Sequence, residues 1–202
     1  MRVDASGWLE GVPRQESPDR GGACVPEVVV MHYTGSGSAK GSADWLSRRD
    51  EVYVSAHVVV GRAGEVTQLV PFTAVAYHAG RSAWAGRTGV NAFSAGIELV
   101  NWGLLTRDGG EVRSSTGQRV SLINDAQYAP HKSEPGVYRW WQRYPAAQVV
   151  AAARVVAAVM DAYPSVAGVV GHEDVSPGRK VDPGPAFPWD DFTPLVASLR
   201  GP

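Results

Sequence analysis

The sequence predicts one α/β (or α+β) domain, in which helices flank a central mixed β-sheet. Short apolar runs rich in β-branched residues, such as VVVMHYT at 28–34, recur along the chain and are typical of buried strands. An alanine-rich stretch at 145–164 is typical of a long helix. The chain has 202 residues, 44% of them hydrophobic, which suffices for one sizeable core and not clearly for two.

The expected elements follow in order along the chain. Residues 1–27 are a polar, turn-rich lead-in, and the domain proper is expected over 28–200. We expect strands at 28–34, 52–61, 65–70, 94–101 and 166–171. We expect helices at 41–49 with Ser42 as the cap, at 145–164 between Pro145 and Pro164, and at 189–199, where Pro194 is an interruption.

Two segments have no regular pattern. Residues 77–94 are rich in glycine and aromatic residues and are expected to be loop. Residues 103–146 form a long insert without sustained periodicity, and segments of that length are usually functional or disordered. The run YRWW at 138–141 is more typical of packing than of ligand stacking.

Composition excludes several classes of function. The net charge is -1, so neither nucleic acid nor an anionic membrane is an expected partner. No apolar run reaches the roughly 18 residues of a membrane helix, and the N-terminus has no apolar signal core, which indicates synthesis for the cytoplasm. Release to the cell wall by lysis or another route remains open. Cys24 is the single cysteine, so no internal disulfide is expected, and the oligomeric state is not predicted.

The loop after the last predicted strand carries candidate metal chemistry. His172 follows the apolar run at 166–171, and His32 ends the run at 28–34 in the same way. Pro183 favours an extended Asp182, which would point Lys180 and Asp182 to one side. Two histidines and one carboxylate are a donor set of catalytic zinc sites. The alternative is two separate strand-end histidines and a surface Lys–Asp ion pair.

Glu98 is the candidate general base. It lies between Ile97 and Leu99 in an apolar strand, where alternation turns it away from them. The alternative is a solvent-facing glutamate. Of the other histidines, His57 is expected to be structural, His78 could line a pocket, and His131 is expected on the surface.

Four stretches together resemble one family: VVVMHYT, VSAHVVVGRAGEVTQLVPF, AYHAGRSAWAGRTGVNAFSAGIELVN and GHEDVSPGRKVDPGPAFPW. They are similar to the zinc-dependent N-acetylmuramoyl-L-alanine amidases, which include anhydro-muropeptide amidases, phage amidases and peptidoglycan recognition proteins. The resemblance implies Zn²⁺ at the strand ends, held by His32, His172 and Asp182. It also implies Glu98 as the catalytic glutamate and Lys180 as the cation that stabilises the oxyanion.

The implied reaction is hydrolysis of the amide between the lactyl group of N-acetylmuramic acid and L-alanine. The alternative function is a peptidoglycan-binding protein without activity, since some family members lack a zinc ligand. Peptidoglycan or a muropeptide is the expected partner, and the sequence does not separate intact wall from soluble fragments. The expected substrate contacts are Tyr33, His78, Trp84, Arg87 and Asn91, with Arg62 a further candidate.

Overall fold

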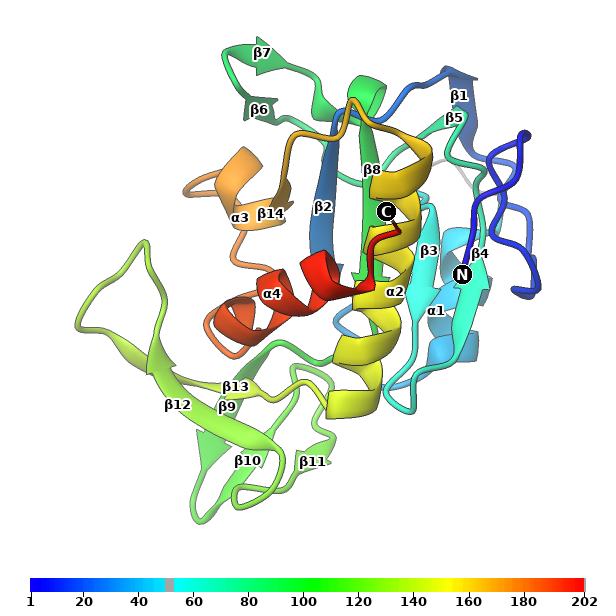
Figure 1. The fold of residues 1–202 in the computed structure, drawn as a ribbon. Coiled ribbons are helices and arrows are strands. Elements are labelled where there is room, and N and C mark those ends of the chain that lie inside the picture. The colour runs from blue at the N-terminus through cyan, green and yellow to red at the C-terminus, as the bar shows by residue number, and fades with distance from the viewer. Residues whose placement is uncertain (50–52, 202) are drawn as a thin grey trace.

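A mixed five-stranded sheet forms the middle of the protein, whose computed structural model describes residues 1–49 and 53–201 (Figure 1). Its strand order is β14 (Val169–Gly171), β2 (Val28–Tyr33), β8 (Ser94–Leu99), β3 (Val58–Val60) and β4 (Val66–Gln68). The first four strands run parallel and β4 is antiparallel. The predicted central mixed sheet is therefore confirmed.

Helices cover both faces of this sheet, which explains why its strands are continuous apolar runs. Val29, Met31 and Ile97 point to one face, against α2 (Ala146–Ala162) and α4 (Trp189–Leu199). Val28 and Val30 point to the other face, where a separate apolar cluster forms. The short helices α1 (Ala39–Leu46) and α3 (His172–Val175) lie on this second side.

Several predicted boundaries were wrong. The first helix begins at Ala39 because the hydroxyl of Ser38 accepts a hydrogen bond from the Gly41 amide at 3.0 Å, so Ser38 is the cap and Ser42 is buried inside the helix. The strand expected at 52–61 is regular only in β3, and its first residue lies outside the described residues. Pro194 lies on an exposed side of α4 and does not end the helix.

The lead-in is part of the domain. The side chain of Leu9 is 1% exposed and belongs to the main core. Its amide donates to the Gln68 side-chain oxygen at 2.6 Å. Further along, β1 (Arg20–Ala23) pairs with β5 (Ala74–Ala76). Between 77 and 94, the expected loop contains a small hairpin of β6 (Ala83–Trp84) and β7 (Arg87–Thr88), then a 3₁₀ turn at Val90–Phe93.

The insert folds as a second, antiparallel sheet of five short strands below the central one (Figure 1). The strands are β9 (Leu104–Asp108), β10 (Glu111–Arg113), β11 (Arg119–Val120), β12 (Ala126–Pro130) and β13 (Tyr138–Gln142). A small cluster of Leu105, Val112 and Ala126 packs within it, while Trp141 belongs to the main core. This explains the absent sequence period, because the strands are short and mostly half-exposed.

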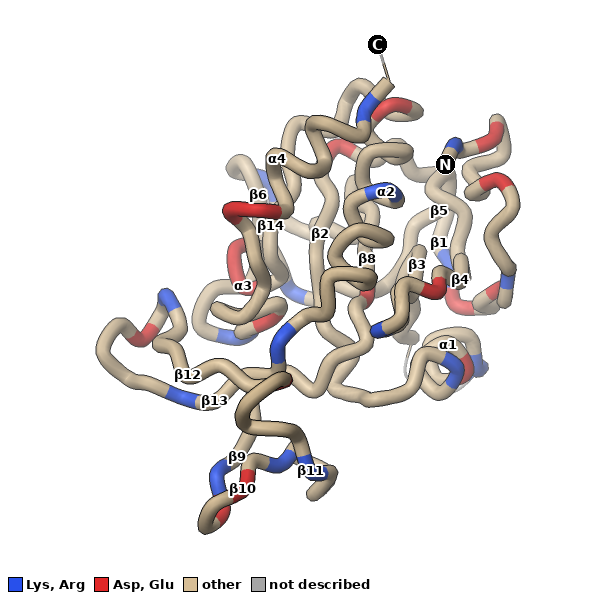
Figure 2. Tube along the Cα trace, turned by 60° about the horizontal axis from the view of Figure 1, so that its bottom comes forward, with Lys and Arg blue, Asp and Glu red and all other residues tan. Residues whose placement is uncertain are grey.

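Charged residues lie mainly at the periphery. Figure 2 shows basic and acidic residues interspersed over the insert and α1, whereas β2 carries no charged residue. In the described part of the chain, no helix is both long and apolar enough to cross a membrane.

Candidate metal centre and its pocket

The candidate ligands come from the carboxyl-terminal edge of the parallel strands. His32 is the last residue but one of β2, and His172 directly follows β14, the neighbouring strand. Asp182 lies in the loop after α3, ten residues beyond His172. The three side chains are buried, although the carboxyl end of a parallel sheet is where ligand-binding crevices usually form.

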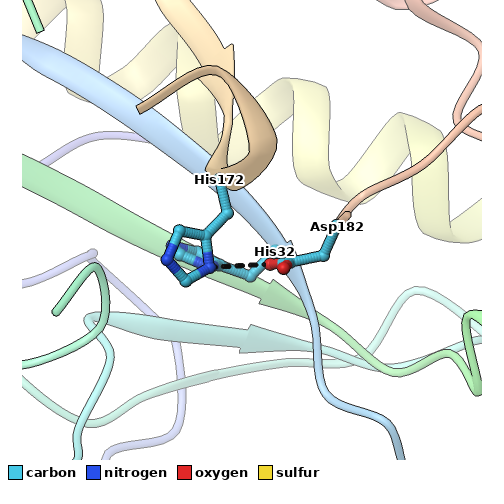
Figure 3. A group of neighbouring side chains, drawn as sticks. All are labelled: His32, His172 and Asp182. Carbon is cyan, nitrogen blue, oxygen red and sulfur yellow. Dashed lines mark hydrogen bonds and ion pairs between the residues drawn. The ribbon is translucent and has the colours of Figure 1, made fainter. Parts of the chain in front are cut away.

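The three side chains point at one another (Figure 3). The Nδ1 atoms of His32 and His172 are 2.9 Å apart, and they lie 3.1 and 3.0 Å from the same Oδ2 atom of Asp182. The structure thus brings together the His–His–Asp set that the sequence pointed to, although the residues are 140 and 10 positions apart. They form a candidate metal site.

The hydrogen-bonding pattern fits a bound cation. The Nε2 atom of His172 is 3.1 Å from the carbonyl oxygen of Ala79, which can only accept, so this nitrogen carries the proton. In a neutral ring, Nδ1 then presents a lone pair to the Asp182 oxygen and to His32. Electron pairs at these distances repel one another unless a cation or a proton lies between them.

Burial and charge put the donors in the forms that bind metals. Burial lowers the pKa of His32 to about 4, so its imidazole is neutral near pH 7. Burial acts to raise the pKa of Asp182, but hydrogen bonds with His172 and His32 outweigh it and hold that pKa well below its ordinary value. A neutral imidazole and an ionised carboxylate are the ligating states of these side chains.

Glu98 faces the same pocket as the candidate ligands. It is the register partner of His32 across β2 and β8, and Ile97 and Leu99 point to the opposite, α2-covered face. Its Oε2 atom is buried without a hydrogen-bond partner among the described residues. Burial, with a smaller effect of the Asp182 charge, raises the pKa of Glu98 to about 8. A carboxyl group with a pKa near neutrality is suited to exchange protons with a substrate or water.

A pocket of about 900 Å³ opens over these groups, and Lys180 and His78 line it with them. Tyr33 also lines it, and burial raises the pKa of this phenol to about 12, so it stays a neutral hydrogen-bond donor. The predicted common orientation of Lys180 and Asp182 agrees with their shared place in the pocket wall.

Four candidate substrate contacts have structural partners and do not line this pocket. Arg87 pairs with Glu27 at 2.5 Å. Trp84 packs on the apolar cluster that contains Val28 and Val30 of β2. The side-chain oxygen of Asn91 accepts the backbone amides of residues 78 and 79, at 3.2 and 2.7 Å. Arg62 forms an ion pair with Asp125 of the insert. Their spacing in sequence gave no sign of these partners.

Sequence reasoning missed other residues near the site. Trp45 of α1 and Thr116 of the insert line the pocket, and Arg179 lines it while donating to the Ala79 carbonyl at 2.6 Å. His131, expected on the surface, is 2% exposed, and its Nε2 lies 2.6 Å from a Glu173 carboxylate oxygen. No local signal indicated this contact, because it joins residues 42 positions apart.

Residues 22–185 match the family model for N-acetylmuramoyl-L-alanine amidase. The chain therefore belongs to that family. It is 32% identical over 211 aligned positions to the 1,6-anhydro-N-acetylmuramyl-L-alanine amidase AmpD of Escherichia coli K12, covering 95% of each chain. It is 37% identical to AmpD of Salmonella typhimurium LT2, covering 95% of this chain and 93% of the relative.

Solved structures agree with this assignment. A crystal structure of selenomethionine AmpD matches with a TM-score of 0.72 at 29% identity, covering 97% of this chain and 99% of the other. E. coli AmiD in complex with the substrate anhydro-N-acetylmuramic acid-L-Ala-D-γ-Glu-L-Lys matches with a TM-score of 0.62 at 27% identity. That match covers 98% of this chain and 66% of AmiD.

Proposed function

We propose that this protein is a zinc-dependent N-acetylmuramoyl-L-alanine amidase. It hydrolyses the amide between the lactyl group of N-acetylmuramic acid and L-alanine. The observation that carries the proposal is the convergence of two imidazole nitrogens and one carboxylate oxygen, in a pocket shared with a buried glutamate oxygen that has no hydrogen-bond partner in the described part of the chain. Family membership and relatives named for this activity support it.

His32, His172 and Asp182 would hold the metal, and three protein donors are the usual number in catalytic zinc sites. When bound, zinc polarises a carbonyl and lowers the pKa of water from 15.7 to about 7. Harder, oxygen-preferring ions suit this nitrogen-rich set less well.

Glu98 moves the protons of the reaction. Its free oxygen takes a proton from the attacking water and then delivers that proton to the nitrogen of the departing L-alanine. A pKa of about 8 in the metal-free pocket makes the protonated form accessible, and a nearby cation favours the ionised form that acts as base. The same residue therefore both removes the proton from water and protonates the leaving nitrogen.

Lys180 supplies a fixed positive charge at the pocket wall. Its ammonium group forms no ion pair with any of the described residues, and it lines the pocket close enough for its charge to favour the ionised form of Glu98. The carbonyl oxygen of the scissile amide becomes an oxyanion in the transition state. A cation aimed at that oxygen stabilises the transition state more than the ground state.

The preferred substrate is a soluble anhydro-muropeptide. This choice is supported by the relatives named as 1,6-anhydro amidases, which this chain matches over nearly their full length. The test is to incubate zinc-loaded protein with soluble anhydro-muropeptide and, separately, with purified sacculi, and to follow released peptide by mass spectrometry. We expect faster release from the soluble substrate, and release slower by about 10²–10⁴-fold with Glu98→Gln. A zinc-loaded protein that binds both materials and releases no peptide would be a binding protein instead.

A further inference from the structure

One short segment, residues 78–79, contacts both candidate histidine ligands at the ring nitrogen that does not face Asp182. The side chain of His78 contacts His32, with its Nδ1 atom 2.9 Å from the Nε2 atom of His32. The carbonyl oxygen of the next residue, Ala79, lies 3.1 Å from the Nε2 atom of His172. The segment is fixed in turn, because the Asn91 side-chain oxygen accepts the amides of both residues.

The His78 ring sits in a cavity shaped for it. On its far side, Nε2 is 3.1 Å from the hydroxyl of Ser94, and both residues are buried. Gly96 of β8 lies directly beneath the ring, and a Cβ atom at this position would stand 2.4 Å from the Cγ atom of His78. A glycine is therefore required in the middle of a strand, where it is otherwise unfavourable.

His32, His78 and Ser94 form a chain of hydrogen bonds, and only one arrangement of protons along this chain is compatible with metal binding. If His32 ligates through Nδ1, its remaining proton must be on Nε2, and that N–H donates to Nδ1 of His78. A neutral His78 then carries its own proton on Nε2 and donates it to the Ser94 hydroxyl. If His78 donated to His32 instead, the His32 proton would be on Nδ1, where it would block the metal.

We propose that His78, which bonds to Ser94 on its other side, is a positioning residue that holds His32 in its metal-binding tautomer. This inference rests on the proposed function in that it takes the cation to be zinc. Groups behind a ligating histidine typically change metal affinity by about 10–100-fold when they are removed. The usual groups are carboxylates, carbonyls and water, so a second imidazole in this place distinguishes the site.

His57 provides a matched control. It is also fully buried, and its ring lies 5.9 Å from that of His78. Among the described residues, however, its nitrogens bond to the backbone alone: Nδ1 accepts from the Gly96 amide at 2.9 Å, and Nε2 donates to the Ala74 carbonyl at 3.0 Å. Replacing His57 therefore disturbs the same core without touching a candidate ligand.

The test measures zinc affinity by competition with a chromophoric chelator, which needs no turnover. His78→Leu should weaken zinc binding by about 10–100-fold, and Ser94→Ala by about tenfold. His78→Asn should bind nearly as tightly as the parent, because the amide oxygen of Asn can accept the His32 proton where Nδ1 did. His57→Leu should leave zinc affinity within about threefold even if it lowers the unfolding temperature.

Equal zinc affinity of His78→Leu and the parent would overturn the inference. So would an Asn variant as weak as the Leu variant, since only packing would then matter. A parent that binds no zinc would overturn the proposed function itself.

If His78→Leu does not fold, nitrogen-15 NMR of the imidazoles in the unmodified zinc-loaded protein decides the matter. We expect the His78 proton on Nε2 with a neutral ring. A proton on Nδ1 of His78 would contradict the proposed direction of the hydrogen bonds from His32 through His78 to Ser94.

Discussion

The central sheet and the insert sheet both have five strands, yet they are stabilised in different ways. Strands β2 and β8 are buried on both faces and lie parallel at the middle of the molecule. The antiparallel insert exposes large apolar side chains, with Ile123 89%, Tyr128 55% and Tyr138 53% exposed. Groups that react must be held within fractions of an ångström. His32 and Glu98 lie on these two strands and His172 follows the neighbouring strand β14, whereas Lys180 and Asp182 lie in the loop after α3. The insert contributes to the pocket rim through Thr116.

Several contacts nevertheless join the insert to the rest of the domain, among them the ion pair of Arg62 with Asp125. Trp141 of β13 is 1% exposed and packs in the main core, in contact range of Gly184. His131 and Lys132 pair with Glu173, which directly follows the candidate ligand His172. The insert is therefore more than a wall beside the substrate groove. Excising 103–146 would open the main core, so point substitutions separate its roles better than a deletion.

The largest expected effect follows from removing a ligand on the central sheet. His172→Ala should lose bound zinc and lower amidase activity by about 10³-fold or more, because no other described side chain shares its position beside Asp182 and His32. Elemental analysis and a muropeptide assay measure the two losses, and circular dichroism should show a retained fold. Full zinc content in this variant would contradict the assigned ligand set.

Next in size is the removal of groups that act without ligating. Glu98→Gln should keep one zinc per chain and lower turnover by about 10²–10⁴-fold, because proton transfer is its assigned role. Loss of zinc from the Glu98 variant would move this residue into the ligand set.

Lys180→Ala should lower turnover by about 10²–10³-fold with similar zinc content.

Substitutions in the insert should act mainly on the free energy of unfolding. Trp141→Ala should lower the free energy of unfolding by about 3–5 kcal/mol, since it leaves a large cavity in the main core. Tyr138 lies three residues before Trp141 on the same strand and is about half exposed, so Tyr138→Ala should change it by about 0.5 kcal/mol or less. Chemical denaturation measures both. Similar effects of the two changes would mean that Trp141 does not join the sheets.

The last expected effect is a pH dependence of the metal-free protein. The pKa of Glu98 is raised from its ordinary value of 4.5 to about 8, so the folded state binds a proton that the unfolded state has lost between these pH values. Stability should therefore fall as pH rises through this window, by at most about 1.4 kcal/mol per pH unit. Glu98→Gln should remove this component. Parallel stability curves for the parent and the variant would show that Glu98 is not buried as described.

Sequence reasoning predicted the central sheet because its strands are fully apolar and its long helix is rich in alanine. It also pointed to His32, Glu98, Lys180, His172 and Asp182 as candidates, because each interrupts or follows an apolar strand or lies in the same short loop, and the resemblance to the amidase family implied their roles. It missed what depends on tertiary contacts. The strands of the insert are too short for a period, and the burial of His131 depends on Glu173.

The structural partners of Asn91 and Arg87, which were expected to contact substrate, could not be predicted for the same reason. Both are polar residues in a loop near the site, and sequence alone does not show that backbone amides and Glu27 already engage them. His78 was expected to line the pocket, and it does, but its contacts with His32 and Ser94 could not be read from spacing.

The most direct test of the central claim is the fate of water oxygen during turnover. Zinc-loaded protein is incubated with anhydro-muropeptide in water enriched in oxygen-18, and both products are weighed by mass spectrometry. Hydrolysis at the lactyl amide predicts one labelled oxygen in the carboxylate of the muramic acid product and an unlabelled peptide with L-alanine at its free amino end. Label in a peptide carboxylate, or no cleavage by fully zinc-loaded protein, would contradict the account.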